Sequence, residues 1–168
     1  MDYVPAFLQS AGEAPWPGLR EVAGELVLDR NALKVTVSEA GLAGAPSVRL
    51  TQGVVGIAHL KGDSVLAVNA RAQGAASELL GFVQRSPVNA MTSEVLARAR
   101  IGGTAHGNFA IQLPLHDAGS TQVGGTVQFD GNDVQITPES PSLGRASGTL
   151  AFSEKGFTVR SAQARVLG

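Results

Sequence analysis

The sequence predicts a mainly β protein, built on a broad antiparallel up-and-down sheet with a short two-helix insertion. Three observations support this fold class. A thirteen-residue pattern occurs three times, residues 104–115 alternate strictly between apolar and polar side chains, and strands do not alternate with helices along the chain. The last observation argues against a parallel sheet. We expect about nine to eleven strands in sequential order.

The repeated pattern begins at Gly24, Gly125 and Gly148, and each copy places large apolar residues at its third, fifth, tenth and twelfth positions. A spacing of two is the period of a strand with one apolar face, and the polar segment between the pairs has the composition of a turn. Each copy is therefore expected to be a β-hairpin with both strands presenting apolar side chains to the same side. These side chains are Leu26, Leu28, Leu33, Val35, Val127, Phe129, Val134, Ile136, Leu150, Phe152, Phe157 and Val159.

Residues 24–73 are expected to form antiparallel strands. Residues 41–47 contain Gly and Pro and predict a loop, and a long strand follows over residues 48–60. The apolar residues in the two halves of this strand are out of phase, and Gly53 lies at the change of phase. A β-bulge there would re-aim the alternation.

The helical insertion is expected over residues 75–99. Ser77 is a candidate N-cap for a first helix, which carries Leu79, Leu80, Phe82 and Val83. The dipeptide Ser86-Pro87 breaks this helix. A second helix is expected from about Asn89, with Met91, Val95 and Leu96 at helical spacing.

The remaining segments complete a single unit over residues 1–168. Residues 1–23 are expected to form a short N-terminal helix and a loop, in which Trp16 anchors one end of a core. Residues 103–168 are expected to return to antiparallel strands. In residues 104–115 the apolar side includes Phe109, Ile111 and Leu113, and Pro114 should end the pairing.

Composition excludes several classes of protein. The net charge of −1 gives no electrostatic reason to expect nucleic acid or an anionic membrane surface, and the absence of Cys removes disulfides and thiolate metal sites. No apolar run approaches the ~20 residues that cross a bilayer, and no signal peptide is visible. We expect a segment of a longer protein whose targeting information lies elsewhere; the alternative is a complete small cytosolic protein.

Residues with catalytic or metal-binding chemistry do not gather in the sequence. His59, His106 and His116 lack the spacing of a metal pair and are expected on the surface or in turns. The segment Gly102–Gly107 lacks the Lys of a phosphate loop, and Gly131–Asp133 is too short for a calcium loop and fits a hairpin turn. We therefore expect no enzyme activity, no catalytic residue, no cofactor and no metal.

The apolar face needs a cover, because exposing so many large side chains would cost about 1.5–3 kcal/mol each. Two interpretations follow. A second sheet or the helices could cover the face, which would give a closed sandwich or barrel with a dry core and a structural or protein-interaction role in the cell envelope. Alternatively, the sheet is curved and its concave side holds an apolar ligand such as acyl chains.

Several stretches, taken in order, resemble a known family. They are Asp2-Tyr3-Val4-Pro5, the segment from Gly24 to Leu28, the helical segment from Glu78 to Val83 followed by Ser86-Pro87, Leu113-Pro114-Leu115, the segment from Gly148 to Phe157, and the final Ala164-Arg165-Val166-Leu167-Gly168. Together they resemble a segment of the YhdP-type proteins of the AsmA-like superfamily, relatives of TamB. The resemblance covers nearly the whole chain and rests on order and spacing rather than on one motif.

The resemblance implies a periplasmic segment of a bridge-like protein anchored in the inner membrane of a Gram-negative bacterium. Such proteins form a long taco-shaped groove that moves phospholipid between the inner and outer membranes and supports outer-membrane integrity. The implied partners are phospholipid acyl chains and the remainder of the same polypeptide, with membrane contact only through parts absent here. The implied groove lining is the apolar set of the three repeats together with Phe109, Ile111 and Leu113.

Overall fold

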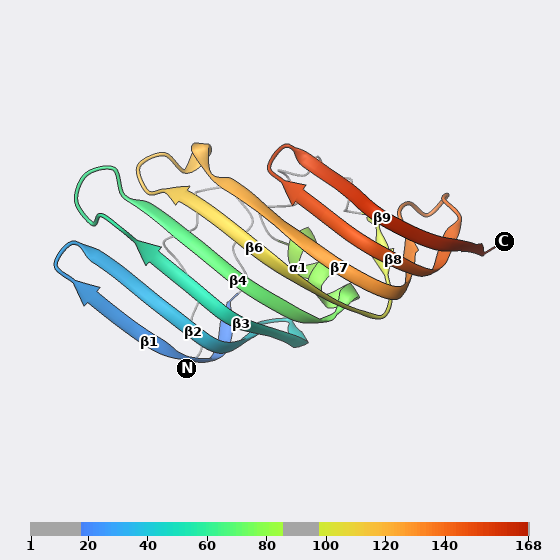
Figure 1. Ribbon diagram of the computed structural model, residues 1–168, viewed down its shortest axis with the longest axis horizontal. Coiled ribbons are helices and arrows are strands. Elements are labelled where there is room, and N and C mark those ends of the chain that lie inside the picture. Colours follow the sequence, from blue (N-terminus) through green and yellow to red (C-terminus); the bar gives the residue numbers. More distant parts are fainter. Residues whose placement is uncertain (1–17, 86–97, 168) are drawn as a thin grey trace.

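Nine antiparallel strands form one open sheet in the computed structural model, which describes residues 18–85 and 98–167 (Figure 1). The strands are β1 (Leu19–Asp29), β2 (Ala32–Leu42), β3 (Ala45–Ile57), β4 (Val65–Ala75), β5 (Arg100–Ile101), β6 (Thr104–Pro114), β7 (Gln122–Gln135), β8 (Ser142–Ser153) and β9 (Gly156–Leu167). One helix, α1 (Ala76–Gln84), lies between β4 and β5, and a 3₁₀ turn spans Ala118–Ser120. The predicted fold class is confirmed in its mainly β, antiparallel character.

The strand order in the sheet follows the sequence, apart from the short β5. Neighbours run β1-β2-β3-β4-β6-β7-β8-β9, and β5 pairs with the end of β7. Within the described residues β1 and β9 therefore each pair on one side only, and these residues form no second sheet. The closed sandwich or barrel does not match this arrangement.

Two of the three predicted hairpins are confirmed. Asp29 pairs with Ala32 across the β1–β2 turn, and Ser153 pairs with Gly156 across the β8–β9 turn. The β2–β3 connection is tighter than the predicted loop, because β2 ends at Leu42 and β3 begins at Ala45. β1 begins at Leu19, earlier than the Gly24 expected from the repeat.

The prediction of a hairpin for the middle copy is wrong, because its two halves form the single strand β7. Gly131 has a φ of +72°, and the pairing of β7 with β8 shifts register on both sides of Asn132. The predicted turn is thus a bulge within one strand. The fully buried Asn132 fixes it, because its Nδ2 donates hydrogen bonds to the carbonyl oxygens of Gly102 and Thr104.

Bulges also occur in other strands and bend the sheet. Glu21, Gln52, Arg145 and Ser161 all have φ between +51° and +53°, and each lies where the strand pairing changes register. A bulge bends its strand and increases the local twist. The bulge predicted at Gly53 is confirmed at the neighbouring Gln52. It brings Leu50 and Val55 to the same face, where they pair with Ala72 and Val68 of β4.

α1 confirms the first predicted helix, but its start differs from the prediction. The N-cap is Ala75 rather than Ser77, and no side chain caps the helix. β4 runs directly into α1, and the backbone N–H of Ala76 donates to the carbonyl oxygen of Gly103. The expected two-helix insertion is not matched, since the described residues contain this one α-helix. The second helix (Asn89, Met91, Val95, Leu96), the N-terminal helix and Trp16 lie outside the described residues.

Candidate apolar ligand pocket

One face of the sheet is apolar across all its long strands. Because cross-strand partners point to the same side, the register places Leu26, Val35, Val55, Val68, Ile111 and Val123 in one row. A second row contains Leu28, Leu33, Ile57, Leu66 and Leu113. A third contains Ala40, Leu50, Ala72, Gly107, Val127, Leu150 and Val159. The one-sided apolar face predicted from the repeats is confirmed.

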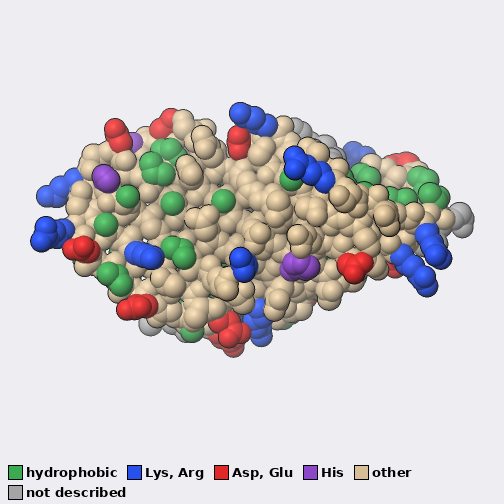
Figure 2. All heavy atoms as spheres, viewed as in Figure 1, with side chains coloured by type: hydrophobic (Ala, Val, Ile, Leu, Met, Phe, Trp, Pro, Cys, Tyr) green, Lys and Arg blue, Asp and Glu red, His purple; other side chains and the backbone are tan. Residues whose placement is uncertain are grey.

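The opposite face is polar. His106, Asn108 and Gln112 alternate with the apolar side chains of β6 and are exposed, as predicted. His106 Nε2 lies 2.8 Å from Gln128 Oε1 on the neighbouring strand. The molecular face in Figure 2 is mostly backbone and uncharged polar side chains, with charged side chains and some hydrophobic side chains scattered over it. The sheet therefore has one mostly polar face and one apolar face.

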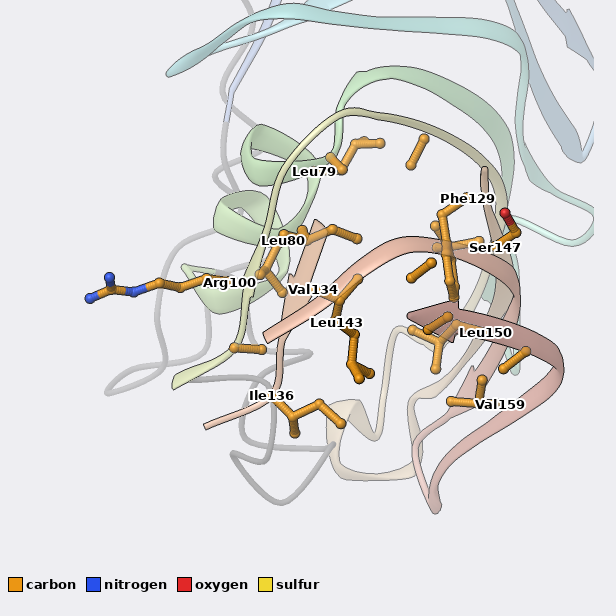
Figure 3. Close-up of a pocket in the computed structure, with 18 of the residues that line it drawn as sticks. Leu79, Leu80, Arg100, Phe129, Val134, Ile136, Leu143, Ser147, Leu150 and Val159 are labelled. Atoms are coloured by element: carbon orange, nitrogen blue, oxygen red, sulfur yellow. The ribbon is translucent and has the colours of Figure 1, made fainter. Parts of the chain in front are cut away.

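A cavity of about 220 Å³ opens on the apolar face. α1 lies on one side of it, and the strands curve around the other (Figure 3). Its lining comes from α1, from residues 99–101 and from strands β6 to β9 with the turn after β7. The labelled side chains of Leu79, Leu80, Phe129, Leu143 and Leu150 converge on it from helix and sheet. The walls are made almost entirely of carbon.

The three polar residues in the lining do not bring a charge into the cavity. The side chain of Arg100 extends away from the cavity, so that only its aliphatic stem contributes (Figure 3). Ser147 Oγ donates to Asp130 Oδ1 at 2.7 Å and accepts from the backbone N–H of Gly131, which engages its hydroxyl with β7. Gln163 is exposed. The arrangement can solvate hydrocarbon, and it offers no polar group positioned for chemistry.

The structure divides the predicted groove residues into groups. Those that line the cavity are Phe109, Val127, Phe129, Val134, Ile136, Leu150, Phe152 and Val159. Those on the same face but outside the cavity are Leu26, Leu28, Leu33, Val35, Ile111 and Leu113. Phe157 is the strand partner of Phe152, but its side chain is not among those that the structure describes. The cavity thus occupies only the C-terminal part of the predicted face.

Sequence reasoning missed part of the lining. Ala76, Leu79, Leu80 and Val83 line the cavity at positions i, i+3, i+4 and i+7 of α1, a spacing typical of one helix face. That signal was visible, but nothing in it indicated which part of the sheet the helix would contact. Leu143 and Ala146 also line the cavity, from the part of β8 that precedes the third copy of the repeat at Gly148.

Metal-binding and membrane-spanning features are not found in the described residues. Within residues 18–85 and 98–167, no three His, Cys, Asp or Glu side chains gather as a metal site. His59, His106 and His116 are all exposed, as predicted. No helix in this part of the chain combines the length and apolar character needed to cross a bilayer.

The fold and the site together define a class of protein, an open antiparallel β-sheet with an apolar cavity on its curved apolar face. Comparison with known families makes this more specific. The chain belongs to the family described as "YhdP protein", whose model matches residues 6–168. Comparisons with curated proteins and with solved structures gave no match.

Proposed function

We propose that this chain is a non-enzymatic segment of a bridge-like periplasmic protein that binds phospholipid acyl chains in its apolar cavity. In this proposal the groove conducts phospholipid between inner and outer membranes of a Gram-negative bacterium and thereby supports the outer membrane. The observation that carries it is the cavity between α1 and strands β6 to β9, whose walls are carbon. Family membership supports the same reading.

The cavity volume indicates how much of a lipid is held. An apolar cavity of about 150 Å³ lined by aliphatic and aromatic side chains binds benzene. A cavity of about 220 Å³ therefore fits a stretch of one acyl chain rather than a whole phospholipid. The headgroup stays in water, because burying an unpaired charge among these side chains would be costly.

The proposed partners are acyl chains and the rest of the same long polypeptide. Neither nucleic acid nor a cofactor has a place in the proposal. The structural alternative, a ligand-free β module, is less favoured because apolar side chains remain uncovered: Leu26 and Leu28 are each 64% exposed. In a packed scaffold such side chains would be covered.

Native mass spectrometry of the purified chain, with lipid extraction, tests the proposal. We expect phospholipid to co-purify and Val159→Asp to remove it, because an acyl chain against this cavity wall would remove water from an unpaired carboxylate. Val159 is 47% exposed, so this change should leave the fold intact. Phe129→Asp and Phe152→Asp should also remove lipid, with some loss of stability.

Gln128→Asp is the matched control, since it puts the same charge on the polar face of β7 and should retain lipid. Repeated absence of lipid from the unmodified chain, or equal retention in Val159→Asp and Gln128→Asp, would contradict the proposal.

A further inference from the structure

The polar face of the sheet carries a second hollow, on the side opposite to the apolar cavity. Its volume is about 370 Å³, within the range of small-molecule sites. Its lining comes from strands β3, β4, β6 and β7 and includes four primary amides, two threonine hydroxyls, Arg71 and His106. Most ligand pockets are lined by apolar side chains, so this polar hollow, as we call it, suits a polar ligand.

The register of the sheet places these polar side chains in two adjacent rows, because cross-strand partners point to the same side. The first row, from β3 to β7, is Thr51, Arg71, Asn108 and Thr126. The second row, from β4 to β7, is Gln73, His106 and Gln128. Directly opposite residues have Cβ atoms about 4.5–5.5 Å apart, so one small ligand can reach several of these groups at once.

The bulge in β3 contributes one side of the polar hollow. Gln52 and Gly53 lie opposite the single residue Ala70, because the pairing with β4 shifts register between Thr51 and Val54. A bulge bends its strand and re-aims a side chain. Gln52, which has a φ of +53°, lines the hollow. The bulge therefore adds a fourth amide to the three that the two rows supply.

The polar hollow holds a cation without a paired acid. Arg71 is the one Arg or Lys in its lining, and no described Asp or Glu lines it. Among the described residues, Arg71 makes no ion pair and no side-chain hydrogen bond. On the same face Arg49 is compensated, since its Nε lies 3.8 Å from Glu39 Oε1. The planar guanidinium of Arg71 is thus free to bind a carboxylate or a phosphate through two parallel hydrogen bonds.

We infer that the polar hollow binds an acidic saccharide, whose carboxylate or phosphate group pairs with Arg71. The amide and hydroxyl side chains of the two rows offer donors and acceptors together, and this matches the hydroxyl groups of a sugar. No described Phe, Tyr or Trp lines the hollow, so hydrogen bonds and the ion pair carry the recognition. The apolar cavity takes no part, and the inference is therefore independent of the proposed function.

The polar hollow is open to water, and this sets the strength of binding. The side chains of Arg71, His106 and Asn108 are all exposed. An exposed ion pair changes an affinity by no more than about fivefold. Binding of a single sugar is therefore weak, and nuclear magnetic resonance titration of the isotope-labelled chain is the suitable measurement.

The titration uses glucuronate, glucose-6-phosphate, glucose and inorganic phosphate as probes. The backbone amide signals of Gln73, Asn108 and Thr126 should shift with the two acidic sugars, at lower concentrations than with glucose or with phosphate alone. Tighter binding of glucuronate would identify a carboxylate ligand, and tighter binding of glucose-6-phosphate would identify a phosphate ligand.

Arg71→Gln should weaken the binding of both acidic sugars about fivefold and leave the binding of glucose unchanged. Arg71→Lys keeps the charge without the planar fork, so its loss should be smaller. Lys34→Gln is the matched control, because it removes an exposed cation from the polar face outside the hollow. Thermal unfolding of each variant reports on the fold.

Glucose binding as tightly as glucuronate, or equal losses in Arg71→Gln and Lys34→Gln, would overturn the pairing of Arg71 with the ligand. Inorganic phosphate binding as tightly as glucose-6-phosphate would overturn the recognition of a sugar. Unchanged signals with all four probes would overturn the inference as a whole. Each of these results leaves lipid co-purification, and with it the proposed function, untouched.

Discussion

Phe109 and Phe152 meet across an intervening strand. Their ring centroids lie 5.8 Å apart at an angle of 50°, although Phe109 belongs to β6 and Phe152 to β8. On β7, Gly125 pairs with both residues. A Cβ atom at Gly125 would lie 2.7 Å from Phe152 Cζ and would overlap the carbonyl oxygen of Asn108. The aromatic contact in the cavity wall therefore requires that residue 125 is a glycine, with no side chain.

Gly125→Ala should destabilise the protein by about 1–3 kcal/mol, the usual cost of overpacking. The added methyl group meets backbone on one side and an aromatic ring on the other, so that neither can yield easily. Urea denaturation measures the loss. Gly124→Ala is the control, because its Cβ would lie 3.5 Å from the nearest atom, an ordinary contact. Equal stability of the two variants would mean that the close approach at Gly125 is not a constraint.

The apolar face was predictable because it needs only the period of two and the pairing of neighbouring strands. The three repeats placed their side chains on one face, and the register confirms this for every described copy. The middle turn was not predictable from the same information. Asp130-Gly131-Asn132-Asp133 has the composition of a turn, and only the distant carbonyl oxygens of Gly102 and Thr104 make it a bulge.

Asn132→Ala tests whether this side chain holds the bulge. The carbonyl oxygens of Gly102 and Thr104 would each lose a partly buried hydrogen bond, which contributes about 0.5–1.5 kcal/mol. We expect lower stability and faster hydrogen exchange at the β5–β7 pairing, measured by mass spectrometry. Asp133→Ala removes an exposed neighbour and should have little effect. Unchanged exchange at β5 in Asn132→Ala would show that the strand pairing alone maintains the bulge.

Glu78→Ala should loosen α1 without unfolding the sheet. The carboxylate accepts both hydrogen bonds from Ser47, and it lies in the first turn of the helix, where negative charge is favourable. We expect a loss of about 1 kcal/mol, discounted for partial exposure. Hydrogen exchange should accelerate in α1 and remain slow in β8.

Glu78→Gln keeps an oxygen acceptor and should lose less than Glu78→Ala. If α1 exchanges at the same rate in both variants and in the unmodified protein, the apolar contacts of Leu79 and Phe82 alone hold the helix on the sheet.

The extent of the cavity could not be read from the sequence, because it depends on where α1 lies. Leu28 and Phe129 both occupy the fifth position of their copy of the repeat and face the same side of the sheet. Only Phe129 lines the cavity, because α1 packs against the buried cluster that Phe129 also contacts. Periodicity identifies a face, whereas the position of a helix over that face is set by long-range contacts such as Ser47 with Glu78.

The exposed apolar side chains at β1 should promote self-association of the chain. Leu26 and Leu28 are each 64% exposed on a strand that pairs on one side only within the described residues. Lys on an edge strand discourages pairing with another chain. The double variant Leu26→Lys, Leu28→Lys should therefore reduce concentration-dependent association in analytical ultracentrifugation. Its stability should change by no more than about 0.5 kcal/mol, as for other surface substitutions.

Val27→Lys is the control for this double variant. Val27 lies on the opposite face of the same strand and is 47% exposed, so the substitution adds charge to the edge without removing side chains from the apolar face. If Val27→Lys suppresses association as much as the double variant does, the association depends on the edge of the strand and not on the apolar face. A large loss of stability in the double variant would mean that these leucines are part of a packed core, and loss of co-purifying phospholipid would mean that they contact the ligand.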